Sequence, residues 1–313
     1  MRVFVAGASG ALGTQLIPQL LAAGHEVVAM VRSPSKEGAL HALGARTALA
    51  DALDRDAVAR AVGETVPDVI VHQLTALSGA PDLRHPDRYF AMTNRLRTEG
   101  TDHLLAAGRA AGVRRVVAQS YAGWPYARTG GPVKTESDPL DPDPPAALRT
   151  TLAAIRHVEE AVTAQPGGVV LRYGGFYGPG TGLSRAADSP MAVPVRKRQF
   201  PLVGGGGGVW SFIHIEDAAT ATVAAVQGGA DGIYNIVDDE PAPVREWLPA
   251  LADALGAKPP LRVPRWLGRL AAGEAGAVMM TEVRGASNAK AKRELGWRPR
   301  YASWREGFAK GLG

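Results

Sequence analysis

An apolar run that ends directly in a glycine-rich turn constrains this chain more than any other feature. The run is Val3–Ala6, and residues 7–13 then read Gly-Ala-Ser-Gly-Ala-Leu-Gly before a helical pattern begins. The first glycine permits a tight turn, the second allows a pyrophosphate to approach the backbone, and the third allows close packing of helix on strand. A helix N-terminus adds free N–H groups and the positive end of its dipole. The sequence therefore predicts dinucleotide binding at this turn.

Short apolar runs alternate with helical patterns along residues 1–172. The predicted strands are Arg2–Ala6, Glu26–Val31, Val69–Gln73, Val116–Gln119 and Val169–Arg172. The predicted helices are Gly13–Ala23, Asp54–Val62, Arg95–Ala111 and Thr150–Thr163. The runs lack polar alternation, as expected of strands that are buried on both faces. This order predicts an α/β fold with a Rossmann-like, doubly wound parallel sheet.

A change of composition after Tyr177 predicts a second, smaller domain. Glycine-rich segments at 178–182 and 204–208 flank a stretch rich in proline and arginine, which we expect to leave the sheet. Residues 1–178 and 209–240 are therefore assigned to the dinucleotide-binding domain, and 179–208 and 241–313 to a mainly helical C-terminal substrate-binding domain. Its predicted helices are Val244–Leu255, Pro264–Ala272 and Ala289–Leu295, with C-terminal caps at Gly256 and Gly296.

Composition excludes several classes of protein. The chain has no cysteine, which rules out thiolate catalysis, cysteine-ligated zinc and disulfides. It also lacks an apolar stretch of about eighteen residues, so we expect no membrane span and a cytoplasmic location. The net charge is +5, but the basic residues are dispersed, which favours a small-molecule ligand over nucleic acid. No spacing of histidines and carboxylates predicts a metal site.

Several segments in a fixed order carry a resemblance to a known family. After the Gly-x-x-Gly-x-x-Gly turn come Asp51-Ala52-Leu53, then His-Gln-Leu-Thr-Ala at 72–76 and Leu-Arg-Tyr-Gly-Gly-Phe-Tyr-Gly-Pro-Gly at 171–180. Phe-Ile-His-Ile-Glu-Asp at 212–217 and Tyr-Asn-Ile at 234–236 follow. Together these segments resemble the extended and atypical short-chain dehydrogenase/reductases, the NAD-dependent epimerase/dehydratase group. The resemblance covers nearly the whole chain.

The resemblance implies cofactor contacts along much of the chain. Those to the phosphates fall at Gly7, Ser9, Gly10, Ala11, Leu12 and Gly13. Those to the adenine and the central riboses fall at Asp51, Ala52, Leu74 and Thr75. Tyr173, Gly175 and Phe176 belong to the segment expected to border the nicotinamide. Asn94, expected to open the next long helix, and Gln119 are further expected contacts to the cofactor.

The loop after the second predicted strand bears on the choice between NADP(H) and NAD(H). An enzyme that prefers NAD places a carboxylate there, whereas this chain has Arg32, Ser33 and Lys36. A guanidinium can bind a 2′-phosphate through two hydrogen bonds. The sequence therefore favours NADP(H) over NAD(H), with an exposed basic loop as the alternative.

One part of the family pattern is missing. In the family, a Tyr and a Lys four residues later share a helix face, and the Lys lowers the pKa of the Tyr, which exchanges a proton with the substrate. No Tyr-x-x-x-Lys occurs in this sequence. Depending on a one-residue choice of register, the Tyr position holds Thr151 or Leu152, and the Lys position Ile155 or Arg156. Neither pair can transfer that proton.

Other side chains are candidates for the missing acid. The resemblance assigns to Ser120 a hydrogen bond to the reacting oxygen, and Tyr121 and Tyr126 are candidate proton donors, with packed aromatic residues as the alternative. His72 is interpreted as a backbone cap more readily than as a catalytic group. We expect Glu159 and its neighbours to form a solvated helix face.

Three functional hypotheses follow. The first is an NAD(P)-dependent oxidoreductase of the atypical short-chain group that reduces a carbonyl or a polarised double bond of a small metabolite. The second is a nucleotide-sugar epimerase or dehydratase, which the missing pair disfavours. The third is a non-redox cofactor-binding protein, or an isomerase or cyclase on the same fold. The resemblance also implies a homodimer that pairs through the helices at 95–111 and 150–163.

Overall fold

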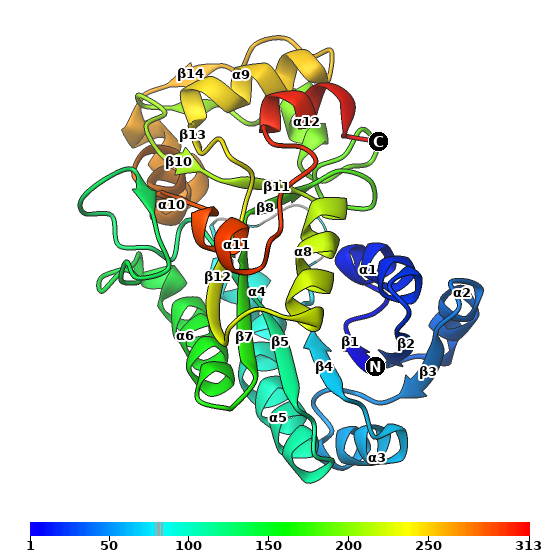
Figure 1. Cartoon of the computed structure of the whole chain (residues 1–313). Coiled ribbons are helices and arrows are strands. Elements are labelled where there is room, and N and C mark those ends of the chain that lie inside the picture. Colours follow the sequence, from blue (N-terminus) through cyan, green and yellow to red (C-terminus); the bar gives the residue numbers. More distant parts are fainter. Residues whose placement is uncertain (78, 80–81, 83) are drawn as a thin grey trace.

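A seven-stranded parallel sheet forms the centre of the molecule in the computed structural model, which describes residues 1–77, 79, 82 and 84–313 (Figure 1). The strand order is β12-β7-β5-β4-β1-β2-β3, and every neighbouring pair is parallel. The strands are β1 Arg2–Ala6, β2 Glu26–Val31, β3 Arg46–Leu49, β4 Val69–His72, β5 Arg115–Tyr121, β7 Gly168–Tyr173 and β12 Gly232–Ile236. The predicted doubly wound architecture is confirmed.

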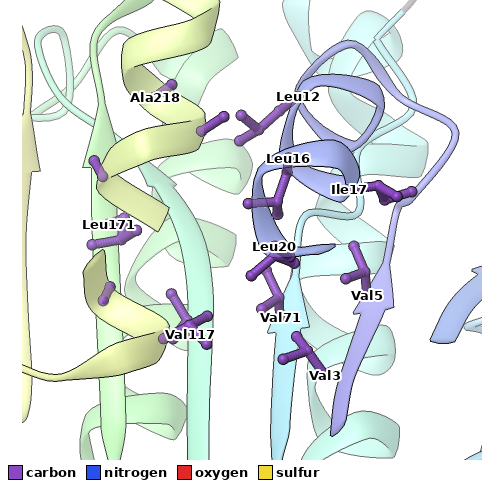
Figure 2. Close-up of a cluster of buried hydrophobic side chains, with 14 of the residues drawn as sticks. Val3, Val5, Leu12, Leu16, Ile17, Leu20, Val71, Val117, Leu171 and Ala218 are labelled. Atoms are coloured by element: carbon purple, nitrogen blue, oxygen red, sulfur yellow. The ribbon is translucent and has the colours of Figure 1, made fainter. Parts of the chain in front are cut away.

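Helices cover both faces of this sheet. Alternate residues of a strand point to opposite faces, so Val3 and Val5 lie in one core cluster and Phe4 lies in another. On the first face lie α1 Ala11–Ala22, α2 Glu37–Ala42 and α8 Ile215–Gln227. On the second lie α3 Arg55–Thr65, α5 Thr101–Ala110 and α6 Arg149–Thr163. Figure 2 shows Leu16 and Leu20 of α1 next to the sheet residues, with α8 beside them.

Between the strand at Glu26–Val31 and the helix that follows it, the structure has one helix and one strand that were not predicted. Strand β3 and helix α2 lie between β2 and α3 in the chain. Because β3 is an edge strand, none of its four residues is fully buried, and its sequence, Arg-Thr-Ala-Leu, lacks an apolar run. The prediction of a single helix between the strands at Glu26–Val31 and Val69–Gln73 was therefore wrong.

Three consecutive helical segments cover residues 86–110, where the sequence predicted one helix at 95–111. Helix α4 spans Pro86–Arg95, a π-helical segment η2 spans Leu96–Gly100, and α5 follows. Pro86 begins α4 because the first helical position needs no N–H donor. Asn94 therefore lies in the last turn of α4, and the prediction that it opens a helix was wrong.

The remaining elements gather mainly around a separate apolar core. Figure 1 shows α9, α10 and α12 together at one end of the molecule. The helices here are α7 Ala192–Arg196, α9 Val244–Ala254, α10 Arg265–Thr281, α11 Ala289–Glu294 and α12 Trp304–Lys310, and short 3₁₀ turns lie at η1 Pro34–Lys36 and η3 Ala146–Leu148. The short strands are β6 Val133–Lys134, β8 Gly175–Tyr177, β9 Leu202–Val203, β10 Val209–Trp210, β11 Phe212–His214, β13 Ala242–Pro243, β14 Arg262–Val263 and β15 Gly285–Ala286. The exact domain division stays a prediction.

Glycines mark the ends and the break of these C-terminal helices. Gly256 and Gly296 follow α9 and α11 with φ of 66° and 62°, as expected of C-terminal caps. Gly273, with φ of 72°, breaks α10, so the predicted helix at 264–272 is only its first half. No described helix is both long and apolar enough to span a membrane.

Candidate cofactor and catalytic site

The glycine turn has the geometry that a bound pyrophosphate requires. Gly7 has φ of 93°, and a Cβ there would lie 2.4 Å from the Gln73 carbonyl oxygen. A Cβ on Gly13 would lie 2.3 Å from the Ala8 carbonyl oxygen. Gly10 caps α1 without any side-chain hydrogen bond, so the first amides of the helix, those of Ala11, Leu12 and Gly13, stay open to an anion. Side chains at these glycines would close the turn, which therefore fits a dinucleotide.

The loop after β2 offers positive charge beside this turn. Arg32 and Lys36 are exposed, and Ser33 is half-buried with its hydroxyl 2.9 Å from that of Ser35. The nearest carboxylate in the sequence, that of Glu37, accepts a hydrogen bond from the Thr47 hydroxyl at 3.0 Å. The loop thus exposes two cations, and its own carboxylate is bound by Thr47.

Asp51 and Ala52 follow β3 at the same edge of the sheet. One oxygen of Asp51 accepts from the Leu53 amide at 3.0 Å. Ala52 is buried, and its carbonyl lies 2.9 Å from Nδ1 of His103. Leu74 and Thr75 follow β4 and are both half-buried. These positions are compatible with the predicted contacts to adenine and ribose.

His72, at the end of β4, is a buried neutral cap. Its Nδ1 accepts from the Leu74 amide at 3.2 Å, so Nε2 carries the hydrogen that faces the Thr101 hydroxyl at 2.9 Å. Burial, reinforced by the charge of Arg97, lowers the pKa of His72 to about 4. The ring is therefore neutral near pH 7 and cannot act as an imidazolium acid toward a substrate.

The residues expected near the nicotinamide lie around the ends of β4, β5 and β7. The Tyr173 hydroxyl is buried 2.7 Å from that of Thr222 and accepts from Nε2 of Gln73 at 3.4 Å. Burial raises its pKa, and both hydrogen-bond partners of its hydroxyl lie within the protein. Phe176 packs on the Tyr173 ring at a centroid distance of 5.3 Å. Gly175 begins β8, and Gln119 is half-buried in β5.

Two of the three predicted catalytic hydroxyls belong to a buried polar network. Ser120 donates to Glu159 at 2.6 Å, and Glu159 also accepts from Nε and Nη2 of Arg172 at 2.7 and 2.6 Å. Tyr126 accepts from Arg172 at 3.0 Å and donates to Asn235 at 2.6 Å. Both hydroxyl protons are thus used inside the protein, which argues against the hydrogen bond from Ser120 to the reacting oxygen and against Tyr126 as the proton donor. The prediction that Glu159 lies on a solvated face was wrong, since this residue is 4% exposed.

Tyr121 is the remaining candidate. It ends β5 and is half-buried, and no hydrogen bond from its hydroxyl is present among the described residues. Burial raises its pKa to about 12, although the charge of Arg97 opposes that shift. Tyr121 therefore stays protonated at neutral pH and can donate to a ligand.

Helix α6 shows what occupies the place of the missing pair. Asn94 donates to the Thr151 hydroxyl at 3.1 Å, which orients Thr151 toward α4. Thr151 and Ile155 are both buried, whereas Arg156 lies at the edge of the helix and donates to the Asp141 carbonyl. This face of α6 supplies neither a phenol nor an amine.

Sequence reasoning missed Arg97, whose side chain lies inside the structure near Tyr121 and Glu159. The sequence indicated it only as a charged residue on the apolar face of the helix predicted at 95–111. No group of His, Asp and Glu able to hold a metal ion occurs among the residues that the structure describes.

Comparisons with known proteins agree with this geometry. The family model for the NAD-dependent epimerase/dehydratase family matches residues 3–237. The chain is 46% identical to a 3-diazoavenalumate denitrifying reductase of a Streptomyces species, over 99% of this chain and 100% of that protein. A Thermus thermophilus UDP-glucose 4-epimerase in complex with NAD has a TM-score of 0.74 at 25% identity, covering 100% of this chain and 98% of that one.

A human epimerase family protein with NADPH has the same fold, with a TM-score of 0.77 at 23% identity over 100% of this chain and 99% of that one. The family match spans most of the chain, and the Streptomyces relative is similar over its whole length. The chain therefore belongs to the NAD-dependent epimerase/dehydratase family and is an NAD(P)-dependent oxidoreductase.

Proposed function

We propose that this enzyme is an NADP(H)-preferring reductase that replaces the diazo group of a small carboxylate with hydrogen. The main support for the proposal is the difference between the cofactor-binding part of the site and its catalytic part. The cofactor turn is complete, whereas α6 presents Thr151 and Ile155 in place of an acid and its supporting cation. The Streptomyces relative, 46% identical, supports the diazo class of substrate.

The chemistry of a diazo group explains why that acid is dispensable. When bound, the nicotinamide would supply a hydride. At a diazonium group, the carbon–nitrogen bonding pair leaves with N₂ and the electron pair of the hydride forms the new carbon–hydrogen bond. Atoms and charge balance without a proton, whereas a carbonyl oxygen would need one. An enzyme of this kind needs orientation and exclusion of water more than it needs acid catalysis.

Carbonyl reduction is the second candidate, and Tyr121 is the observation that favours it. Its phenol is protonated and has no described partner at the end of β5. A Tyr121→Phe variant separates the two candidates. Carbonyl reduction should lose about 10²-fold or more in kcat without its acid, whereas reduction at a diazonium needs no proton and should lose at most about tenfold, the worth of one hydrogen bond to the substrate.

The direct experiment follows N₂ release. The purified enzyme is mixed with NADPH and diazotised 3-aminocinnamate carrying a ¹⁵N label, and labelled N₂ is measured against loss of NADPH absorbance. We expect one N₂ for each NADPH. Gly13→Ala, in which the added methyl group collides with the Ala8 carbonyl, serves as the matched control for uncatalysed reduction. NADPH oxidation with carbonyl substrates but no labelled N₂ above this control would refute the proposal.

The preference for NADP(H) rests on Arg32. Losing one charge-assisted hydrogen bond to phosphate costs about 1.5–3 kcal/mol, so Arg32→Ala should weaken NADPH binding by about 10- to 100-fold. NADH binding should be unchanged. Arg60→Ala, which removes an exposed arginine of α3, is the control for net charge. Equal weakening of NADPH and NADH by Arg32→Ala would contradict the assignment.

A further inference from the structure

Arg97 is a buried cation without a described counterion. It lies in the π-helical segment η2, which packs against α6, and its side chain is 6% exposed. Within residues 1–77, 79, 82 and 84–313, no carboxylate oxygen lies within 4.0 Å of its guanidinium, and no hydrogen bond leaves it. Arg172, equally buried, has Glu159 as a bidentate partner. Because an unpaired buried charge is costly, Arg97 is expected to have a partner beyond the residues that the structure describes, and a bound ligand can be that partner.

The surroundings of Arg97 lie at the edge of the sheet where ligands of this fold bind. The Arg97 carbonyl accepts from the Thr101 hydroxyl at 2.7 Å, and that hydroxyl contacts His72 at the end of β4. The Tyr121 phenol at the end of β5 and the Glu159 carboxylate both act electrostatically on the guanidinium. Glu159 is already bound by Ser120 and Arg172, and His72 is neutral. Burial lowers the pKa of Arg97 to about 10, so it remains charged at neutral pH.

Two unpartnered acceptors point to the same edge. Asn94, one helical turn before Arg97, is 7% exposed, and its Oδ1 has no partner in the described part of the chain. Gln73, directly after β4, is 5% exposed, and its Oε1 likewise has none there. Buried acceptors of this kind are usually satisfied, and their grouping here is typical of a site that a ligand completes.

We propose that Arg97 and Tyr121 form a subsite for an anionic oxygen of the substrate, next to the reacting group. The inference deepens the proposed function and rests on it for the identity of the reacting group. A diazonium cation alone would be repelled by Arg97. The substrate is therefore a diazo compound with a phenolate or enolate oxygen adjacent to the diazo group. The negative charge of that oxygen offsets the positive charge of the diazonium.

The charge balance of the reaction fits this subsite. The hydride forms the carbon–hydrogen bond, and N₂ departs with the former carbon–nitrogen pair. The oxygen keeps its negative charge, which the diazonium no longer offsets. Arg97 and the Tyr121 hydroxyl then stabilise an anion that grows as the reaction proceeds, which is the condition for faster turnover.

Turnover of a matched pair of substrates tests the subsite. The pair is diazotised 3-amino-4-hydroxycinnamate, which carries the oxygen, and diazotised 3-aminocinnamate, which lacks it. We expect kcat/KM for the first to exceed that for the second by about tenfold or more. Arg97→Met should abolish this ratio and Arg97→Lys should retain part of it. Arg95→Met removes an exposed arginine of the adjacent turn and should leave the ratio unchanged. Equal kcat/KM for both compounds in the wild-type enzyme would overturn the proposal.

A binding measurement separates failure of the subsite from failure of the proposed function. The NADP⁺-loaded enzyme is titrated with 4-nitrophenol, whose phenolate form absorbs visible light. Wild-type enzyme should lower the apparent pKa of the bound phenol, and Arg97→Met should not. If neither diazo compound releases N₂ but this pKa shift is present, the proposed function fails and the subsite stands. If nitrophenol binds without a pKa shift, or does not bind, the subsite is refuted even where N₂ is released.

Discussion

Removing one charge from the buried network around Glu159 should destabilise the protein strongly. The carboxylate accepts two hydrogen bonds from Arg172 and one from Ser120, all between 2.6 and 2.7 Å. In Glu159→Gln the shape is kept, but the buried Arg172 loses its counterion. Removing one partner of a buried ion pair costs about 3–5 kcal/mol.

The assay is thermal unfolding of the apoprotein. At about 2 °C per kcal/mol for a chain of this size, Tm should fall by about 6–10 °C in Glu159→Gln. The double variant Glu159→Met/Arg172→Met removes both buried charges and should recover more than half of this loss. Glu99→Gln, which breaks the exposed pair with Arg95, should leave Tm unchanged.

The reasoning is refuted if Glu159→Gln and Glu99→Gln have the same Tm. It is also refuted if the double variant is less stable than Glu159→Gln, because the cost would then come from packing and not from the uncompensated arginine.

Three further predictions concern the turn and two buried titratable groups. Gly13→Ala should abolish the thermal shift on addition of NADPH, whereas Gly63→Ala, at an open position on α3, should keep it. Burial raises the pKa of Asp238 to about 8, so the folded state holds a proton that the unfolded chain releases near 3.8, and stability falls as pH rises through this window. The Tm gain of Asp238→Asn over wild type should therefore widen from pH 4 to pH 8, and a constant difference would contradict this. His72 has its pKa lowered from 6.5 to about 4, so its contribution to stability is full above pH 6.5 and is lost as pH falls toward 4; His72→Gln should flatten the Tm profile in that range.

Local patterns were sufficient for the parts of the fold that depend on neighbouring residues. The run Val3–Ala6 and the glycines after it identify a strand, a turn and a helix start within a dozen positions, and all three are present. Strand β3 was missed because an edge strand needs no apolar run. Asn94 was misplaced because its helix begins earlier, at Pro86.

The catalytic side of the site depends on contacts between distant parts of the chain. Glu159 was interpreted as solvated because its helix neighbours are polar, but Ser120 and Arg172 come from two strands that only the folded sheet brings together. Arg97 lies in the π-helical segment η2, and its burial depends on α6, which packs against η2 from a distant part of the chain. The residues assigned to the cofactor, the preference for NADP(H) and the homodimer stay predictions.

The packing of α1 against α8 has a consequence for how the chain is made. Leu12, Leu16 and Leu20 of α1 are buried partly by α8, which begins only at Ile215 (Figure 2). While the ribosome is still producing the intervening segment, these leucines remain in contact with water. Nascent chains with such uncovered surface are prone to aggregate. Fragments that stop before Ile215 should therefore be insoluble, and recombinant yield should respond more to chaperone supply than to the stability of the finished enzyme.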